Sequence, residues 1–149
     1  MTSLNGIFFL RTPMDLLQKL EADYHRLKAL NPDSIEANYS AFDFFVTAEH
    51  LPDWIKHTSG GSISSHRKYP DGALVSHIAS GAKHFHVQDS RHTTVSDTDV
   101  FGCFDPAAFC ASAFDVRRLV ILLENGNRED VLDVAERIVL HWREILLRE

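Results

Sequence analysis

The chain has 149 residues, of which 44% are hydrophobic and 24% charged, and it contains nine histidines, five prolines and two cysteines. This composition excludes a disordered tail, a disulfide scaffold and a coiled-coil rod, and a chain of this length can bury about two thirds of its unfolded surface. The formal net charge of −6, with His neutral, disfavours non-specific binding to nucleic acid or to an anionic membrane. Protonation of the histidines would reverse that sign, so the net charge depends strongly on pH.

A short apolar cluster at residues 7–10 opens the chain, with no Lys or Arg before it. It lacks the length and charge of a signal peptide, and no apolar run approaches the roughly 18 residues of a membrane span. Cys103 and Cys110 are separated by six residues, which fits neither a metal knuckle nor a redox pair, so we expect free thiols. We therefore expect a soluble, cytoplasmic protein that is not bound to a membrane.

Two helices are predicted in the first third of the chain. Thr12 followed by Pro13 and Asp15 is typical of a helix start, and apolar residues at helical spacing extend that helix to about residue 30. Residues 33–36 have the pattern of a capping box for a second helix, which is apolar on nearly all sides and is expected at the centre of its bundle. Pro52 must either kink this helix or begin a new one, because proline has no N–H to donate.

The middle of the chain is predicted to change character twice. Residues 58–72 indicate a long loop, which in a compact domain is either disordered or functional. A third helix is predicted over about residues 73–83, with Leu74, Ile78 and Phe85 on one stripe. Residues 86–104 suggest short strands, and residues 104–114 fit either a helix or an irregular strand.

The last third contains the clearest strand signal. Residues 118–123 predict a strand, Asn125-Gly126 favours a hairpin to a return strand at 128–131, and a final helix begins near residue 132. The fold prediction is therefore one domain, residues 1–149, of the mainly α (α+β) class. It consists of a four-helix bundle with a small antiparallel β-hairpin or meander inserted between the third and the C-terminal helix, at about residues 86–131.

Polar residues around the proline of the second helix form the first candidate site. His50, Asp53 and His57 are spaced by three and four residues, so an unbroken helix places them within an arc of about 60°. His77 and His84 are seven residues apart on the third helix and also share a face. Helices that project imidazole and carboxylate groups toward one another are how metal sites are built in bundles.

The candidate metal ligands are therefore His50, Asp53, His77 and His84, with His57 in reserve, and the cofactor would be a divalent transition metal. The spacing matches no established metal motif. The alternative is a polar cluster of His50, Asp53, His77, Lys83 and His84 that only fixes the pairing of two helices. No catalytic residue follows from either interpretation.

A basic stretch and a set of apolar residues supply two further candidates. Lys83 and His84, continuing to Arg91, suggest binding to an anion or to RNA, although cations are also common at a solvated helix end. Apolar residues near the two ends of the chain suggest a protein interface, or else they complete the core. These candidate interface residues are Phe8, Phe9, Trp142 and Leu146. The motifs of phosphate loops, dinucleotide-binding folds and nucleophile elbows are missing from the sequence.

Two segments carry a resemblance to small uncharacterised bacterial and prophage proteins. The segments are Thr-Ala-Glu-His-Leu-Pro-Asp-Trp at residues 47–54 and Gly-Ala-Lys-His-Phe at residues 81–85, and a C-terminal helix with a Trp accompanies them. The resemblance implies a bacterial or phage-related protein and draws attention to His50, Asp53, Trp54, Lys83 and His84, but it implies no activity.

A bundle of this size is also similar to the HEPN-like domains of toxin–antitoxin and phage-defence systems. Their ribonuclease motif is an Arg followed by a His after four to six residues, whereas Arg137 and His141 are separated by three. This resemblance therefore implies a relative without the ribonuclease motif.

The sequence thus favours a small helical protein that acts through a protein partner or as a homo-oligomer, with no established catalytic activity. One alternative is a metal-dependent enzyme or metal-binding protein that uses the His/Asp cluster. A second is an HEPN-like, RNA-related component of a defence or toxin–antitoxin system.

Overall fold

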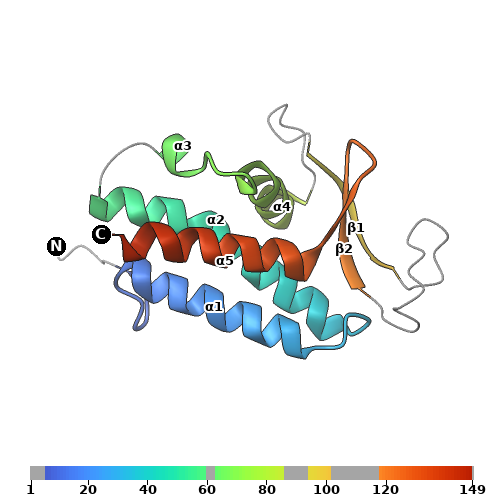
Figure 1. Cartoon of the computed structure of the whole chain (residues 1–149). Coiled ribbons are helices and arrows are strands. Elements are labelled where there is room, and N and C mark those ends of the chain that lie inside the picture. The colour runs from blue at the N-terminus through green and yellow to red at the C-terminus, as the bar shows by residue number, and fades with distance from the viewer. Residues whose placement is uncertain (1–5, 60–62, 86–93, 102–117, 149) are drawn as a thin grey trace.

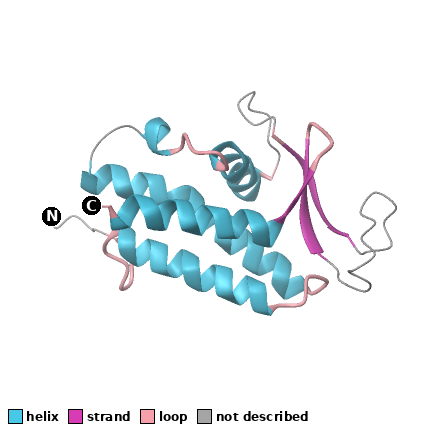
Figure 2. Cartoon of the chain, viewed as in Figure 1, coloured by secondary structure: helices cyan, strands magenta, loops and turns pink. Residues whose placement is uncertain are grey.

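A computed structural model of the chain describes residues 6–59, 63–85, 94–101 and 118–148. It is mainly helical with a small antiparallel sheet, as predicted (Figure 2). The helices are α1 (Pro13–Ala29), α2 (Ile35–Ser59), α3 (Ile63–His66), α4 (Gly72–His84) and α5 (Val131–Leu147). The strands are β1 (Val95–Phe101), β2 (Arg118–Leu123) and β3 (Arg128–Asp130).

The start of α1 follows directly from local sequence. The Asp15 N–H donates to Thr12 Oγ1 over 3.1 Å, and the Thr12 N–H donates to Asp15 Oδ2 over 3.0 Å. This reciprocal capping box satisfies two backbone donors that the first turn leaves open. The same carboxylate also accepts from the Arg11 N–H, and these backbone hydrogen bonds hold the pKa of Asp15 below its ordinary value.

The second helix is longer than predicted. A helix does start at this point, at Ile35, but its cap differs from the box predicted at 33–36: Ser34 Oγ accepts the Ala37 N–H over 3.2 Å. Pro52 lies inside α2, so the prediction that a new helix could begin there is wrong. The helix continues to Ser59, where the Thr58 hydroxyl reaches the carbonyl oxygens of Trp54 and Ile55, each at 3.2 Å. Together with α3, it replaces part of the predicted loop at 58–72 with helix.

The helices enclose one hydrophobic core. Helix α1 lies against α2 and α5, and α4 lies against α2, with the sheet at the end of the helices opposite to the chain termini (Figure 1). Leu119 and Ile121 of β2 join this core from the sheet. Its largest fully buried side chains include Leu17, Leu20, Phe44, Leu51, Ile55, Ile138 and Trp142.

The sheet has the order β1-β2-β3, with antiparallel pairing throughout. The predicted hairpin is confirmed: the Gly126 N–H donates to the Leu123 carbonyl and the Leu123 N–H to the Asn127 carbonyl, each over 2.9 Å. Gly126 has a φ of +86°, the left-handed conformation that closes a three-residue hairpin loop. Residues 86–93 and 102–117 lie outside the described residues, and with them Arg91, both cysteines and the ambiguous stretch 104–114.

The predicted apolar stripe of the third helix is only partly correct. Leu74 is buried and Ile78 packs against the core, but Phe85 is almost fully exposed. Phe85 is the C-cap of α4 and has a φ of +64°, so the chain leaves the helix there and the side chain does not continue the stripe.

Candidate functional site

The five residues of the predicted polar cluster lie on α2 and α4, as expected, but at different depths. His50 is exposed and Asp53 half-buried on α2, whereas Lys83 and His84 are exposed at the end of α4. His77 is half-buried, and its Nδ1 accepts the Val95 N–H over 3.0 Å, which ties α4 to β1. Among the described residues, no group of three or more His, Cys, Asp and Glu could hold a metal ion. Metal binding by these residues stays a prediction.

The polar contacts between α2 and α4 are made by the sequence neighbours of the predicted histidines. The Ser76 hydroxyl donates to Glu49 Oε2 over 2.8 Å, and Arg67 Nη2 lies 2.9 Å from Glu49 Oε1. The same Arg67 nitrogen lies 3.7 Å from Asp53 Oδ2. Burial raises the pKa of Glu49, while the Ser76 hydrogen bond and the Arg67 charge act in the opposite direction.

Sequence reasoning missed Glu49, Arg67 and Ser76. The spacing of Glu49 and Asp53, four residues apart on one helix face, was an available signal for a shared cation. Arg67 lies in the connection after α3, distant in the sequence from Glu49 and Asp53. Their spacing therefore did not identify it as that cation.

The connection from Arg67 to Gly72 is fixed to α5 by aromatic and charged contacts. The Tyr69 ring stacks on His141, with centroids 4.5 Å apart, and meets Trp142 edge-on at 5.0 Å. Arg137 donates to both Asp71 oxygens, at 2.9 and 3.2 Å, and these bonds raise the pKa of Arg137. Glu49 pairs with Arg67, and Asp71 pairs with Arg137. These ion pairs, with the aromatic contacts of Tyr69, join α2, α4 and α5 and do not form an open site.

Replacing Gly72 by Ala should lower the free energy of unfolding by about 1–3 kcal/mol, since an added Cβ would overpack the site. That Cβ would lie 2.0 Å from the Arg67 carbonyl oxygen, which is backbone and cannot rotate away. Urea denaturation of the variant measures the change. Unchanged stability would contradict this close packing.

His141 should make the stability fall in mildly acid solution. Burial lowers the pKa of His141, although the charges of Glu144 and Asp71 act in the opposite direction. The unfolded chain therefore binds a proton first as the pH drops through about 6.5, and the native state loses stability below that value. In His141→Phe, which keeps an aromatic ring against Tyr69, the decrease between about pH 7.5 and pH 5 should be smaller than in the wild type. Equal slopes in urea denaturation across that range would contradict the expectation.

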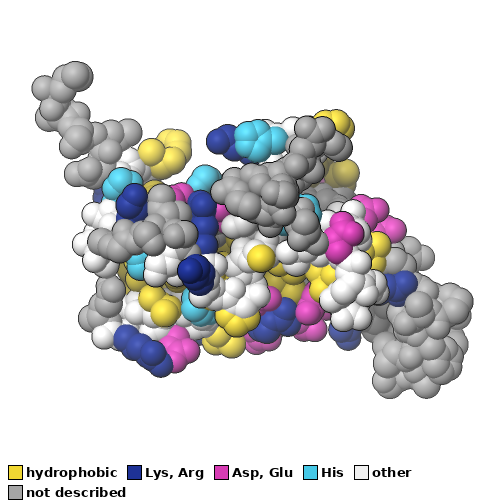
Figure 3. Space-filling model, turned by 90° about the horizontal axis from the view of Figure 1, so that it is seen from above, with side chains coloured by type: hydrophobic (Ala, Val, Ile, Leu, Met, Phe, Trp, Pro, Cys, Tyr) yellow, Lys and Arg dark blue, Asp and Glu magenta, His cyan; other side chains and the backbone are white. Residues whose placement is uncertain are grey.

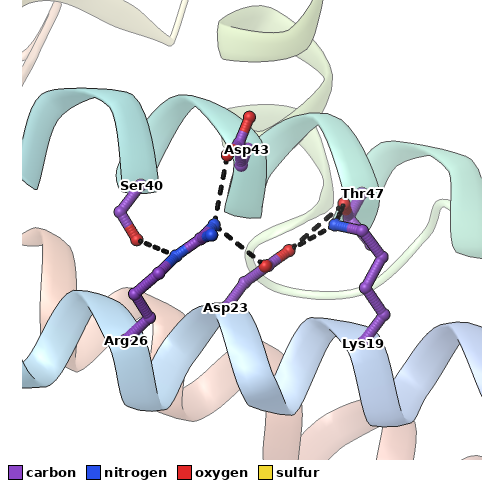
Figure 4. Close-up of polar contacts among 6 residues, drawn as sticks. All are labelled: Lys19, Asp23, Arg26, Ser40, Asp43 and Thr47. Atoms are coloured by element: carbon purple, nitrogen blue, oxygen red, sulfur yellow. Dashed lines mark hydrogen bonds and ion pairs between the residues drawn. The ribbon is translucent and has the colours of Figure 1, made fainter. Parts of the chain in front are cut away.

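A second polar network lies between α1 and α2 (Figure 4). Asp23 is 5% exposed, and its carboxylate contacts Lys19 Nζ at 2.7 Å and Arg26 Nη2 at 3.1 Å. Lys19 also donates to Thr47 Oγ1, and Arg26 reaches Ser40 and Asp43. Every partner belongs to one of the two helices, so this network fixes their pairing.

The predicted interface residues separate into two groups. Trp142 is 1% and Leu146 9% exposed, so both belong to the core and are not available to a partner. Phe8 and Phe9, in contrast, are 84% and 96% exposed. Two phenylalanine side chains exposed to water add no stability to an isolated domain. This pair is therefore a candidate contact surface.

Residues 6–10, called here the N-terminal turn, present these two side chains in a fixed geometry. Backbone hydrogen bonds join Ile7 and Leu10 in both directions, at 3.0 and 3.1 Å. Gly6 has a φ of +74°, and a Cβ there would lie 2.0 Å from the Leu10 carbonyl oxygen. Phe8 has a φ of +54°, which is uncommon for a residue with a side chain and costs free energy.

A cavity of about 600 Å³, called here the turn pocket, lies between the N-terminal turn and the end of α2. Its lining residues are Gly6, Ile7, Arg11, Pro13, Trp54, His57 and Thr58. Figure 1 places the N-terminal turn at the end of the helices where α5 also ends. Gly6 and Ile7, which line the turn pocket, directly precede the exposed Phe8 and Phe9 in the sequence.

Other surfaces are less distinctive. A cavity of about 460 Å³ near the start of α5 has core residues such as Leu27 and Val131 in its wall and a rim of mixed charge that includes Lys28, Arg118 and Glu136. Ile35, Tyr39 and Phe42 form an exposed stripe on α2. On the face seen in Figure 3, the described basic and acidic side chains are interspersed and do not separate by sign.

Comparison with known proteins found no match to this chain among protein-family models, curated proteins or solved structures. Within the described ranges, no helix has both the length and the apolar character needed to cross a bilayer.

Proposed function

We propose that this chain is a protein-interaction module, in which a bundle of helices supports the N-terminal turn as the contact surface for a protein partner or for a second copy. The observation that carries the proposal is the exposure of Phe8 and Phe9 at the tip of a hydrogen-bonded turn. The resemblance to bacterial and prophage proteins, together with the expected cytoplasmic location, supports a partner from a bacterial or phage-related setting.

The energetics favour such a contact. Burying a phenylalanine side chain that was exposed to water contributes about 1.5–3 kcal/mol, so a partner that covers Phe8 and Phe9 gains from both. The hydrogen bonds between Ile7 and Leu10 already fix the backbone, so little ordering of the turn remains to be done on binding. Aromatic side chains presented in this way are typical of the residues that dominate binding energy at interfaces.

The test uses the full chain as bait in a lysate of its source cells, in three forms. These are the wild type, the double variant Phe8→Ser/Phe9→Ser, and the control Leu140→Ser, which removes an exposed apolar side chain on α5. Light scattering of each purified form reports self-association. We expect a protein, or a second copy of the chain, that is bound by the wild type and the control but lost from the double variant. The same bound set in all three forms would contradict the proposal.

A further inference from the structure

We propose that the cavity near the start of α5, called here the sheet-end pocket, binds a small zwitterion with an apolar body. An apolar amino acid and a short apolar peptide with free ends both have this chemistry. The inference does not depend on the N-terminal turn, because the sheet-end pocket shares no lining residue with the turn pocket. Helix α1 ends and helices α2 and α5 begin at this pocket, at the end of the bundle next to the sheet (Figure 1).

The floor of the sheet-end pocket is apolar and belongs to the core. Four of its lining residues are at most 8% exposed, and each comes from a different element: Leu27, Ala37, Leu119 and Val131. Partly buried apolar or aromatic residues extend this lining: Tyr24, Leu30, Pro32 and Leu132. The volume of about 460 Å³ is in the range of sites for small molecules, and its floor is already packed in the fold.

Three charged side chains of the lining are not paired within the fold. Lys28 is exposed in the last turn of α1, and Asp133 and Glu136 are exposed in the first two turns of α5. None of these three side chains forms an ion pair or a hydrogen bond with another residue in the described ranges. The Lys28 ammonium lies 5.9 Å from the ring centroid of Tyr24, which also lines the pocket.

The other two charged residues of the lining are already paired. Asp130 Oδ1 accepts the N–H groups of Leu132 and Asp133, at 2.8 and 3.2 Å, as the N-cap of α5. Asp130 Oδ2 lies 3.4 Å from Arg118 Nη1. Because this ion pair largely cancels its own charge, a ligand in the pocket meets mainly the charges of the three unpaired side chains.

Unpaired charges of both signs around an apolar floor select the class of ligand. A ligand that carries only a carboxylate can pair with Lys28 but not with Asp133 or Glu136, and a ligand that carries only an ammonium group can pair with the two acids but not with Lys28. A zwitterion can do both, while its apolar body covers the buried floor. The charge pairs then set specificity and orientation, and the apolar contacts contribute most of the affinity.

The test is isothermal titration calorimetry of the full chain with the dipeptide Leu-Leu in three forms. One form has free ends, one is acetylated at the amino end, and one is amidated at the carboxyl end. We expect the free form to bind and each blocked form to bind at least about tenfold more weakly, because each loses one charge-assisted hydrogen bond. Leucine in the same titration separates the two sources, since tighter binding of leucine indicates an amino acid and tighter binding of Leu-Leu a peptide.

Two variants assign each preference to its side chains. Lys28→Gln should remove the preference for the free carboxylate and keep the preference for the free ammonium group, whereas the double variant Asp133→Asn/Glu136→Gln should do the reverse. Lys56→Gln is the matched control: Lys56 is exposed in the last turn of α2, does not line the pocket, and should leave both preferences unchanged. The replaced groups form no ion pairs in the fold, so we expect folded variants, which circular dichroism verifies.

Three results would each overturn the inference. They are no binding of leucine or Leu-Leu at millimolar concentration, equal binding of the free and blocked dipeptides, and a Lys28→Gln variant that keeps the preference for the free carboxylate. The variants that test the proposed function change Phe8, Phe9 and Leu140, which do not line the sheet-end pocket. Failure of this inference therefore leaves the proposed function standing, and failure of the proposed function leaves this inference standing.

Discussion

Replacing Asp23 by Ala should lower the free energy of unfolding by about 3 kcal/mol, because it removes the shared acceptor of a network between α1 and α2. The carboxylate is buried and contacts Lys19, Arg26 and Thr47. Both cations are partly exposed, with side-chain exposures of 39% and 52%, so they can regain water and the loss stays below that of a fully buried pair. Urea denaturation at neutral pH measures the change.

Asp43→Ala is the matched control. Asp43 also pairs with Arg26, at 3.1 Å, but its side chain is 51% exposed, and exposed ion pairs contribute at most about 1 kcal/mol. A similar loss in the two variants would show that the buried position of Asp23 does not matter and would contradict its role between the helices.

Trp142→Ala should cost about 3–5 kcal/mol of unfolding free energy, whereas Phe9→Ala should change it by no more than about 0.5 kcal/mol. The sequence indicated both residues as interface candidates, but Trp142 is 1% and Phe9 96% exposed. Removing the buried indole leaves a cavity next to the Tyr69 ring. Removing the exposed Phe9 ring leaves no cavity.

Thermal and urea denaturation of the two variants checks this contrast. A loss above about 1 kcal/mol for Phe9→Ala would mean that the turn packs against the chain and is not presented to solvent. A stable Trp142→Ala variant would contradict the placement of Trp142 in the core.

The elements that could be predicted are those whose structure depends on residues close together in the sequence. The helix start at Thr12 and the hairpin at Asn125-Gly126 depend on neighbours in the sequence, and both were confirmed. Pro52 shows the limit of such rules. The surrounding residues, Leu51 and Ile55, are buried on the face that packs against the core, and this burial favours a continuous helix over the lost hydrogen bond.

The sites were harder to predict because they depend on distant residues. The helical pairing of α2 with α4 was expected, but Glu49 and Ser76 make the hydrogen bond where His50 and His77 had been indicated. One residue of offset on a helix is a rotation of about 100°, which sequence spacing alone does not fix. Similarly, the sequence indicated an apolar helix face with Trp142 and Leu146. Only the packing shows that this face is buried in the core of the same chain and does not form an interface.

Photo-crosslinking at Phe9 in living source cells tests the central claim, that the N-terminal turn is a contact surface, most directly. p-Benzoylphenylalanine replaces Phe9 in one form of the chain and Leu140, which is exposed on α5, in the other. We predict that illumination produces a discrete adduct with a protein or with a second copy from position 9 and none from position 140. No adduct from position 9, or the same adducts from both positions, would contradict the claim.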